Sequence, residues 1–489
     1  MQTLPEKLYL AAQTRKIDQI AIDEKGIPGI ELMRKAGLTV FELIQANYSN
    51  YDLIVFCGAG NNAGDGYVIA KLAVEAKINV EVYYLSEPNQ LKNDALIAYQ
   101  DYCHVGGICT EFVHNIILND SVVVDSLLGT GLDREVTGHY AKAIKSINQS
   151  TCPVIAVDIP SGLNADTGCL MGCAVKADYT VSFIALKQGL FTGDAAEYCG
   201  KISYTSLDIS DDVFNKVDYA SKLITHLSIP KRNRCAHKGN HGHVLLIGGE
   251  IGFSGAIRLA AEAALRVGSG LVSVATRLTH FSTINFGRPE LMCYGIEEAD
   301  DLLPLLDKAS IVVIGPGLGQ STWAKDLFKI AVSSDKPVVC DADALNILAK
   351  DNNYYDNNWV LTPHPGEASR LLGCSTENIA KDRFSAISQL QKQLGGVIVL
   401  KGAGSLIAKG NEITVSTTGN PGMASGGMGD VLAGMIGGLI AQKMDLYEAS
   451  VAAVYLHGKA ADLSAQTNGE IGLLASDLMP FIRRLINQQ

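Results

Sequence analysis

The stretch Gly426-Gly427-Met428-Gly429-Asp430 comes directly before an apolar segment, 431–441, that is expected to form a helix. Glycines at the start of a helix leave several backbone N–H groups free to point at one place, where they and the positive end of the helix dipole attract an anion. Asp430 is expected in the first turn, where its carboxylate can take a proton from a hydroxyl group; the alternative is that it only caps the helix. The stretch therefore predicts an anion hole suited to a phosphoryl group in transfer.

Apolar runs with the length of buried strands alternate with helix-period segments on both sides of this stretch. This alternation is typical of parallel sheets with helices on their faces, so both halves of the chain are predicted to be α/β. The expected strands are 53–57, 80–85, 122–125, 154–158 and 179–183 in the first half, and 244–247, 272–275, 311–314, 338–340, 359–361, 397–400 and 405–408 in the second.

The segment 207–240 interrupts this rhythm with an acidic pair, a proline and the basic cluster Lys231-Arg232-Asn233-Arg234. A chain of 489 residues exceeds the roughly 250–300 residues that one core supports, so two domains are expected. We place the boundary near 210–235, with domains at 1–215 and 225–489. Because the two halves carry different motifs, they are predicted to be a fusion of unlike domains.

The composition, 47% hydrophobic and 19% charged residues, is that of an ordinary globular protein. The net charge of −11 argues against a general nucleic-acid surface, and no apolar run reaches the roughly 20 residues of a membrane span. The start of the chain does not have the pattern of a signal peptide, and the eleven cysteines form no CxxC pair. We therefore expect a cytoplasmic protein with reduced thiols and no nucleic-acid or membrane partner. We also expect a homo-oligomer, although the sequence does not decide the oligomeric state.

Five further motifs of the second half follow expected strands. His364 alone is more readily a turn histidine than a catalytic one, and no partner lies at zinc-ligand spacing. The lysine and open amides of the motif at Lys401 suit nucleotide phosphates, although the same pattern fits a hairpin turn. The motifs are Gly248-Gly249-Glu250-Ile251-Gly252-Phe253-Ser254-Gly255-Ala256, Gly315-Pro316-Gly317-Leu318-Gly319, Asp341-Ala342-Asp343-Ala344-Leu345-Asn346, Thr362-Pro363-His364-Pro365-Gly366-Glu367 and Lys401-Gly402-Ala403-Gly404-Ser405.

In this order the motifs resemble the ribokinase-like superfamily, and within it the ADP- or ATP-dependent NAD(P)H-hydrate dehydratases, over residues 230–489. The resemblance implies a ribokinase-like α/β domain that uses ADP or ATP with Mg²⁺. It implies that the adenine nucleotide binds at Lys401, Gly402, Ala403, Gly404, Ser405 and Gly429, and that the hydrated dinucleotide binds at Ala256, Gly317, His364 and Asp430.

Three loops of the first half also end expected strands. The first, Gly58-Ala59-Gly60-Asn61-Asn62-Ala63-Gly64-Asp65-Gly66, precedes an expected helix at 67–76; the others begin at Asp125 and at Asp158. In open α/β sheets ligands gather at the carboxyl ends of strands, so these loops are expected to converge on one crevice. The alternative is a tight turn with two capping aspartates.

Residues 1 to about 215 resemble the epimerase domain of the bifunctional NAD(P)H-hydrate repair enzymes, also through the opening segment Ala21-Ile22-Asp23-Glu24-Lys25-Gly26-Ile27-Pro28-Gly29-Ile30-Glu31-Leu32-Met33. The resemblance implies a Rossmann-like three-layer fold. Ala63 replaces a glycine of the family pattern, and its methyl group requires a negative φ. The implied hydrate site comprises Asn61, Asn62, Ala63, Gly64, Asp65, Gly129, Thr130, Gly131, Leu132, Asp133, Arg134, Glu135 and Asp158, and the implied K⁺ site comprises Asn62, Asp125 and Ser161.

The leading hypothesis is a repair enzyme that interconverts (R)- and (S)-NAD(P)H hydrates and dehydrates the S form, with Asp430 as general base and Asp158 as the acid–base group of the epimerase. One alternative is a ribokinase-like vitamin or sugar kinase that releases a phosphorylated product. Another is a first domain that only binds a dinucleotide or a partner. The sequence does not separate ADP from ATP, or NADH hydrate from NADPH hydrate.

Overall fold

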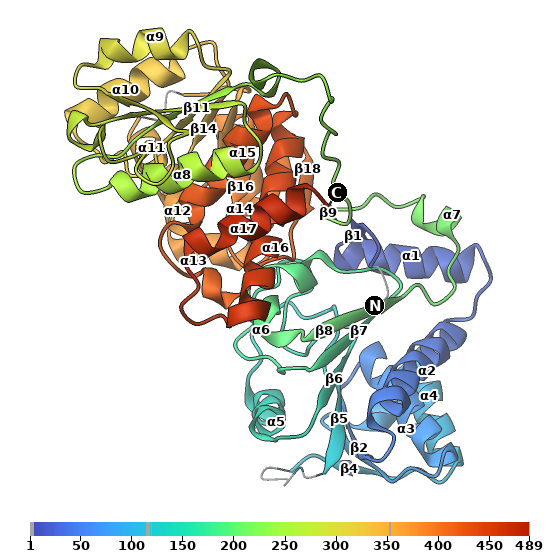
Figure 1. Cartoon of the computed structure of the whole chain (residues 1–489). Coiled ribbons are helices and arrows are strands. Elements are labelled where there is room, and N and C mark those ends of the chain that lie inside the picture. Colours follow the sequence, from blue (N-terminus) through green and yellow to red (C-terminus); the bar gives the residue numbers. More distant parts are fainter. Residues whose placement is uncertain (1–3, 114–117, 119, 352–353, 489) are drawn as a thin grey trace. The chain divides into compact units, whose positions relative to one another are not determined.

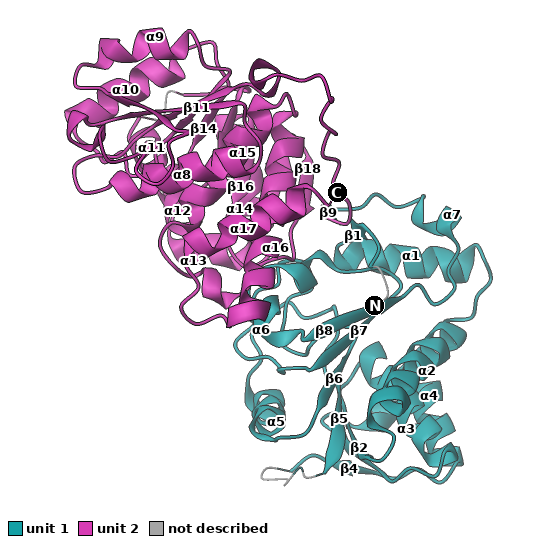
Figure 2. Ribbon diagram, viewed as in Figure 1, with its two compact units in different colours: residues 1–223 teal, residues 224–489 magenta. Residues whose placement is uncertain are grey.

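The protein is described by a computed structural model that covers residues 4–113, 118, 120–351 and 354–488. The chain forms two compact units, Met1–Leu223 and Ile224–Gln489 (Figure 2). Residues 216–223, which include the short strand β9 (Ser221–Leu223), belong to the first unit, where β9 pairs antiparallel with β1 (Lys7–Leu8).

The first unit is built on a parallel sheet with the strand order β4-β3-β2-β5-β6-β7-β8. The chain starts this sheet at β2 and builds it outward in both directions, so the order reverses between β2 and β5. Ligands of open α/β sheets bind at such a point, beyond the carboxyl ends of the strands. The strands are β2 (Asp52–Cys57), β3 (Val80–Tyr84), β4 (Cys109–Glu111), β5 (Ser121–Ser126), β6 (Val154–Val157), β7 (Tyr179–Phe183) and β8 (Lys201–Thr205).

Helices cover both faces of this sheet, which makes three layers (Figure 1). Alternate residues of β2 divide between the two cores: Leu53 and Val55 pack with α1 to α4, whereas Ile54 and Phe56 pack with α5. Continuous apolar strands are expected when both faces are buried. The helices are α1 (Ala11–Asp23), α2 (Gly29–Tyr48), α3 (Asn61–Glu75), α4 (Asn93–His104), α5 (Gly138–Gln149), α6 (Ala195–Tyr198) and α7 (Asp211–Phe214).

The second unit has the same kind of strand order, β12-β11-β10-β13-β14-β15-β16-β17-β18. The strands up to β16 are parallel, and β17 and β18 continue the sheet as antiparallel hairpins. Its order reverses between β10 and β13. The strands are β10 (His243–Ile247), β11 (Leu271–Thr276), β12 (Met292–Gly295), β13 (Ile311–Ile314), β14 (Val338–Cys340), β15 (Trp359–Leu361), β16 (Val397–Leu400), β17 (Leu406–Lys409) and β18 (Glu412–Val415).

One face of this second sheet is covered by α8, α15, α16 and α17, which share its core. Contacts of α10 with β13 and of α14 with β16 and β17 cover the other face. The α/β prediction for both halves is therefore confirmed. The helices are α8 (Ser254–Arg266), α9 (Leu303–Leu306), α10 (Thr322–Val332), α11 (Asp343–Leu348), α12 (Pro365–Leu372), α13 (Thr376–Lys381), α14 (Arg383–Leu394), α15 (Met428–Ala441), α16 (Leu446–Asn468) and α17 (Leu478–Ile486).

The expected loop at 58–66 is wrong in one respect, because α3 already begins at Asn61. A Cβ at Gly64 would lie 2.6 Å from Sδ of Met33 and 2.9 Å from Cα of Ala95, so this glycine serves close packing between α3 and its neighbours. Ala63 is buried in the first turn, and its φ is not positive. The alanine is thus compatible with the local backbone.

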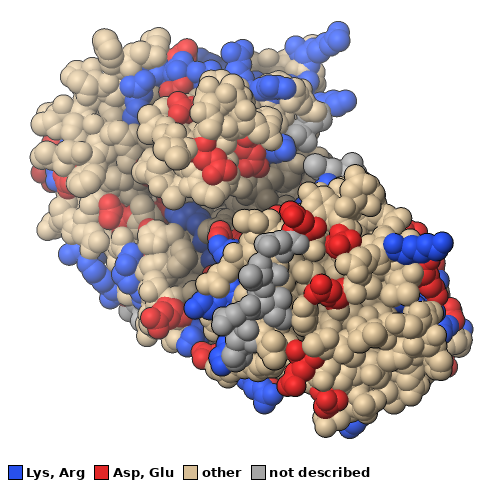
Figure 3. All heavy atoms as spheres, turned by 90° about the horizontal axis from the view of Figure 1, so that it is seen from below, with Lys and Arg blue, Asp and Glu red and all other residues tan. Residues whose placement is uncertain are grey.

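None of the helices in the described residues has the length and apolar character needed to cross a membrane. On the face drawn in Figure 3, basic and acidic side chains are interspersed, apart from a group of Lys and Arg at the upper edge.

Candidate active sites

A cavity of about 530 Å³ opens in the first unit where the strand order reverses. The turn after β2, the loop after β5 and Asp158, which begins the loop after β6, line it together with residues of α1, α2 and the loop after β7. The expected convergence of the three loops is therefore present. Predicted site residues that line the cavity are Asn61, Asn62, Asp65, Gly129, Thr130, Gly131, Leu132, Asp133, Arg134 and Asp158.

Ala63, Gly64 and Glu135 are not among the lining residues. The N–H groups of Ala63 and Gly64 donate to the carbonyl of Gly60 at 3.0 and 3.3 Å, and Glu135 is exposed. A role for these three residues in binding stays a prediction.

Oxygen atoms gather around Leu128, beside the cavity. Asn62 Nδ2 donates to the Leu128 carbonyl at 3.1 Å, and Ser161 Oγ lies 3.1 Å from the same carbonyl. Ser161 Oγ also donates to Asp125 Oδ1 at 2.6 Å. Burial raises the pKa of Asp125 to about 6, although hydrogen bonds from Ser161 and Leu127 oppose the shift. The three residues predicted to bind K⁺ thus share one neighbourhood rich in oxygen.

Asp158 holds a fully buried lysine. Its Oδ1 accepts hydrogen bonds from Lys187 Nζ, from the N–H of Phe183 at 3.1 Å and from Ser182 Oγ at 3.3 Å. Lys187 Nζ also donates to the Phe183 carbonyl at 3.0 Å. Asp158 has a φ of 68°, a region that non-glycine residues seldom occupy and that often marks functional sites. Both side chains line the cavity.

Asp65 is a second carboxyl group of the same cavity. Burial raises its pKa well above the ordinary value, the charges of Asp158 and Asp18 raise it further, and Lys187 lowers it. The cavity therefore combines a carboxyl group that favours its neutral form with a carboxylate held by an ammonium group. A neutral carboxylic acid next to an ion-paired carboxylate is an arrangement suited to acid–base chemistry.

In the second unit, the start of α15 has the geometry that the glycines predicted. Gly427 is the N-cap with a φ of 92°, a conformation that favours glycine. A Cβ at Gly429 would lie 3.2 Å from Lys401 Nζ, so this lysine lies close to the helix start. No side chain caps the helix. The free N–H groups, the helix dipole and Lys401 together favour an anion here.

Lys401 belongs to a network of charged side chains with Asp341 and Glu367. Its Nζ is 2.7 Å from Asp341 Oδ1, which also accepts from Thr362 Oγ1 at 2.7 Å. Glu367 Oε2 is 3.8 Å from the same Nζ. Burial lowers the pKa of Lys401, but Asp341 and Glu367 outweigh it and raise the value. Lys401 is thus held as a cation.

Two carboxyl groups of this site have strongly raised pKa values. Burial, followed by the charge of Asp341, raises the pKa of Asp430 to about 7, against the opposing effect of Lys401. Burial also raises the pKa of Glu367 to about 7. A carboxyl group with a pKa near 7 is suited to general-base catalysis at neutral pH.

His364 is both a helix cap and a candidate ligand. Its Nδ1 accepts a hydrogen bond from the N–H of Gly366 at 3.0 Å, and Nε2 is 3.4 Å from Glu367 Oε1. Burial and the charges of Lys401 and Arg370 lower its pKa. The neutral ring therefore carries its proton on Nε2, and the side chain is half exposed.

The segment from Lys401 to Ser405 is the hairpin turn between β16 and β17. Arg383, which is 5% exposed, donates to the carbonyl groups of Leu400 and Lys401 at 3.2 and 3.3 Å. The turn is thus fixed from inside, and its lysine is directed to the start of α15. Both sequence interpretations, a turn and a phosphate-binding lysine, are compatible with this geometry.

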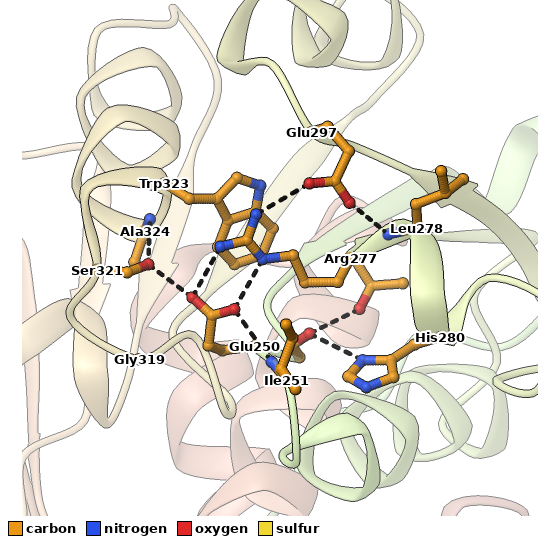
Figure 4. Close-up of polar contacts among 12 residues, drawn as sticks. Glu250, Ile251, Arg277, Leu278, His280, Glu297, Gly319, Ser321, Trp323 and Ala324 are labelled. Atoms are coloured by element: carbon orange, nitrogen blue, oxygen red, sulfur yellow. Dashed lines mark hydrogen bonds and ion pairs between the residues drawn. The ribbon is translucent and has the colours of Figure 1, made fainter.

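A polar network fixes the loop that precedes α8 (Figure 4). Arg277 donates to Glu250 at 2.7 Å and to Glu297 at 3.0 Å, and its guanidinium lies 4.2 Å from the ring centre of Trp323. Ser321 Oγ donates to Glu250 at 2.6 Å. These contacts connect the loops after β10, β11 and β13, at the point where the strand order reverses.

Ala256 and Gly317, both predicted to bind the hydrate, lie beside each other at this point. A Cβ at Gly317 would be 3.2 Å from Cβ of Ala256 and 2.6 Å from the Phe253 carbonyl. The N–H of Glu250 donates to the Gly317 carbonyl at 2.7 Å, which connects the two glycine-rich loops.

Sequence reasoning missed Lys187 and His457, and it placed Asp341 in a motif after an expected strand without giving it a role. Lys187 could have been found by its place beyond the carboxyl end of β7. His457 lies inside α16, where no motif marks it; it is 6% exposed, and its Nε2 has no hydrogen-bond partner in the described residues. Burial lowers its pKa to about 4, with a further contribution from Lys401.

Comparison with known proteins assigns a family to each unit. The family described as NAD(P)H-hydrate dehydratase matches residues 244–484, and the family described as YjeF-related protein N-terminus matches residues 29–189. The bifunctional NAD(P)H-hydrate repair enzyme Nnr of Coxiella burnetii is 47% identical over 487 residues, 98% of this chain and 99% of that protein. The chain belongs to this family of bifunctional repair enzymes. The family member of Escherichia coli is 41% identical and covers 100% of the chain and 95% of its own length.

The solved structure of a ribokinase-like superfamily protein from Enterococcus faecalis is 32% identical, with a TM-score of 0.50. It covers 53% of the present family member and 92% of that protein. The ribokinase-like fold predicted for the second half is confirmed.

Proposed function

We propose that the first unit interconverts the R and S hydrates of NAD(P)H and that the second unit dehydrates the S hydrate with ADP or ATP. The observation that carries the second activity is the position of Asp430 and Lys401 at the uncapped start of α15. Family membership along nearly the whole chain supports the pairing of the two activities.

In the second unit, the hydroxyl of the hydrated ring attacks the terminal phosphoryl group of the nucleotide, and Asp430 accepts its proton. The N–H groups at the start of α15 and Lys401 stabilise the charge that develops on the phosphoryl oxygens. The ring then expels phosphate with loss of a proton from the neighbouring carbon, which restores the double bond. Phosphate leaves more easily than hydroxide, so the nucleotide makes the dehydration favourable.

Magnesium enters this scheme as part of the nucleotide substrate. Among the described residues, no group of three or more His, Cys, Asp or Glu side chains is arranged to hold a metal ion. Mg²⁺ usually keeps several water ligands and binds through substrate phosphates and one or two carboxylates. Asp341 and Glu367, beside Lys401, would supply the carboxylates of such a shell.

In the first unit, Asp158 and Asp65 are the proposed proton-transfer pair. Inversion at the hydrated carbon requires that one of its bonds to oxygen or nitrogen break and re-form, with a proton donated to the departing atom and later removed. A neutral Asp65 supplies the proton and the Asp158 carboxylate accepts one. Lys187 positions Asp158 through an ion pair.

K⁺ is the proposed resident ion of the first unit. Asp125 is fully buried, and within the described residues its charge is met by neutral hydrogen-bond donors rather than by an ion pair. The oxygen atoms of Asp125, Ser161, Asn62 and the Leu128 carbonyl suit a hard cation. Bound K⁺ would neutralise the Asp125 carboxylate and order the loop after β5.

The deciding experiment supplies the purified protein with a mixture of R and S hydrates of NADPH and with ADP or ATP. We expect the absorbance of NADPH to recover completely, with release of inorganic phosphate. Accumulation of a phosphorylated small molecule without NADPH would instead establish the kinase alternative.

The pH dependence of dehydration should report Asp430. Because Asp430 must be ionised to accept a proton and its pKa is about 7, kcat/KM is expected to rise as the pH increases to about 7 and then to level off. Asp341→Asn removes a charge that raises this pKa, so it should move the rise to lower pH. In Glu367→Gln the rise in kcat/KM should stay near pH 7. If the rise disappeared in this variant, the titrating group would be Glu367.

The K⁺ site predicts an ion-specific stability. Without a cation, the raised pKa of Asp125 means that folding loses free energy as the pH increases from about 4 through about 6, because the buried group must ionise. K⁺ should therefore raise the melting temperature of the first unit above pH 6, relative to Li⁺ at equal ionic strength, and less so below pH 4. Asp125→Asn should abolish this difference. If K⁺ raised the melting temperature of Asp125→Asn as much as that of the unaltered protein, Asp125 would not be a ligand of the ion.

A further inference from the structure

A second cavity, of about 650 Å³, lies within the second unit, away from the site described above. Arg266 at the end of α8 and Gln442 after α15 line it, whereas Ala256 and Asp430 lie at the opposite ends of these two helices. Its volume is in the range of about 300–1,000 Å³ that is usual for small-molecule sites.

The lining is basic although the chain as a whole carries a net charge of −11. Glu290 is the single acidic residue among the described residues that line the cavity. Apolar side chains, Leu265, Val267 and Ile486 among them, form the rest of the wall. The basic residues are Lys231, Arg232, Arg266, Arg288 and Arg483.

Some of these basic side chains already pair with groups of the protein itself. Arg266 and Arg288 both pair with Glu262, and Arg232 donates to the Gly268 carbonyl and, at 3.3 Å, to Gln442. Such contacts also satisfy the end of α8, which attracts cations. Helix capping therefore explains Arg232 and, in part, Arg266.

The remaining charge has no such explanation. Within the described part of the chain, Lys231 and Arg483 form no ion pair. An anion in the cavity would supply the missing counter-charge to these two side chains.

The shape and the lining of the cavity indicate which kind of anion it binds. Guanidinium and ammonium groups that converge from several segments suit a phosphate, whose oxygens accept several charged hydrogen bonds at once. The apolar wall suits an uncharged group attached to it. A nucleic acid would require basic residues along an extended surface, whereas these residues surround a concave space.

We propose that this cavity binds a small phosphorylated metabolite, with the phosphate at Lys231, Arg288 and Arg483 and the uncharged part against the apolar wall. The site is independent of the nucleotide site at Lys401.

The test is calorimetric titration of the full-length protein with inorganic pyrophosphate. The double variant Lys231→Gln/Arg483→Gln should bind pyrophosphate at least about tenfold more weakly than the unaltered protein, since charged hydrogen bonds to phosphate are lost. The matched control Arg234→Gln/Arg484→Gln removes the same charge from the same two segments, at exposed residues that do not line the cavity. It should bind as the unaltered protein does.

A variant that adds a negative charge tests the same site in case the double variant Lys231→Gln/Arg483→Gln does not fold. Asn487 lines the cavity at the end of α17, and Asn487→Asp should weaken pyrophosphate binding without removing a basic residue. Lack of binding by the unaltered protein, or equal binding by both double variants, would overturn the proposal. So would tighter binding of a short single-stranded oligonucleotide that is lost in the same variants, because the cavity would then belong to a nucleic-acid surface.

Discussion

Asp430→Asn is expected to lower the rate of hydrate dehydration about 10³-fold, because general-base catalysis contributes about 10²–10⁴-fold. Asparagine has nearly the same size, so the change removes the proton acceptor and leaves the start of α15 in place. The rate is measured in a single turnover from NADPH absorbance, with the S hydrate and saturating ADP or ATP. Interconversion of the hydrates by the same protein should be unchanged and serves as an internal control.

The stability of this variant separates catalysis from helix capping. A capping aspartate contributes about 0.5–2 kcal/mol, so its loss would destabilise the protein. The pKa of Asp430 is instead raised to about 7, so its ionisation costs folding free energy as the pH increases from about 4 through about 7. Asp430→Asn should therefore unfold at the same or a higher denaturant concentration at pH 8. Asp307→Asn, at an exposed position after α9, is the control for loss of an aspartate. A destabilised variant that keeps its dehydration rate would contradict the catalytic role.

Much of the fold could be predicted from the sequence because buried parallel strands are short apolar runs. The strands β13 and β16 have the predicted bounds, and all four residues of each are buried. β4 and β12 were missed, since they are edge strands whose residues are half-buried or exposed and so lack the apolar signal. Hydrophobic pattern therefore predicts the interior of both sheets better than their edges.

The glycines were the least reliable guide to local structure. Gly426 and Gly427 do precede α15, although Met428, Gly429 and Asp430 of the predicted turn already belong to that helix, whereas all residues at 61–66 lie inside α3. The difference arises from what each glycine contacts. Gly427 needs its freedom for a positive φ, while Gly64 needs only the absence of a side chain against Met33 and Ala95. Such tertiary reasons are not visible in the sequence.

The polar partners of the sites were also beyond sequence reasoning. Lys187 is 29 residues from Asp158, and Asp341 is 60 residues from Lys401. These pairs meet because parallel strands bring their carboxyl ends to one edge. The sequence therefore predicts which loops converge, but not which side chains form ion pairs there.

Asp158→Asn should abolish epimerisation, with a loss of at least about 10²-fold, while dehydration of the S hydrate continues. Asparagine is preferred to alanine because Asp158 has a φ of 68°, a conformation that asparagine adopts readily. The amide can still accept a hydrogen bond from Lys187, so the buried ammonium group is not left without a partner.

With a mixture of the two hydrates and saturating nucleotide, the unaltered protein should restore all of the NADPH, whereas Asp158→Asn should stop when the S hydrate is exhausted. The matched control is Asp120→Asn, since Asp120 also has a positive φ, 47°, but is exposed and does not line the cavity. Lys187→Met should give the same defect with a more strongly lowered stability, because it leaves the Asp158 carboxylate without its ion pair. Complete recovery of both hydrates by Asp158→Asn at the normal rate would show instead that the first unit only binds the dinucleotide, and the neutral Asp65 would lose its proposed partner in proton transfer.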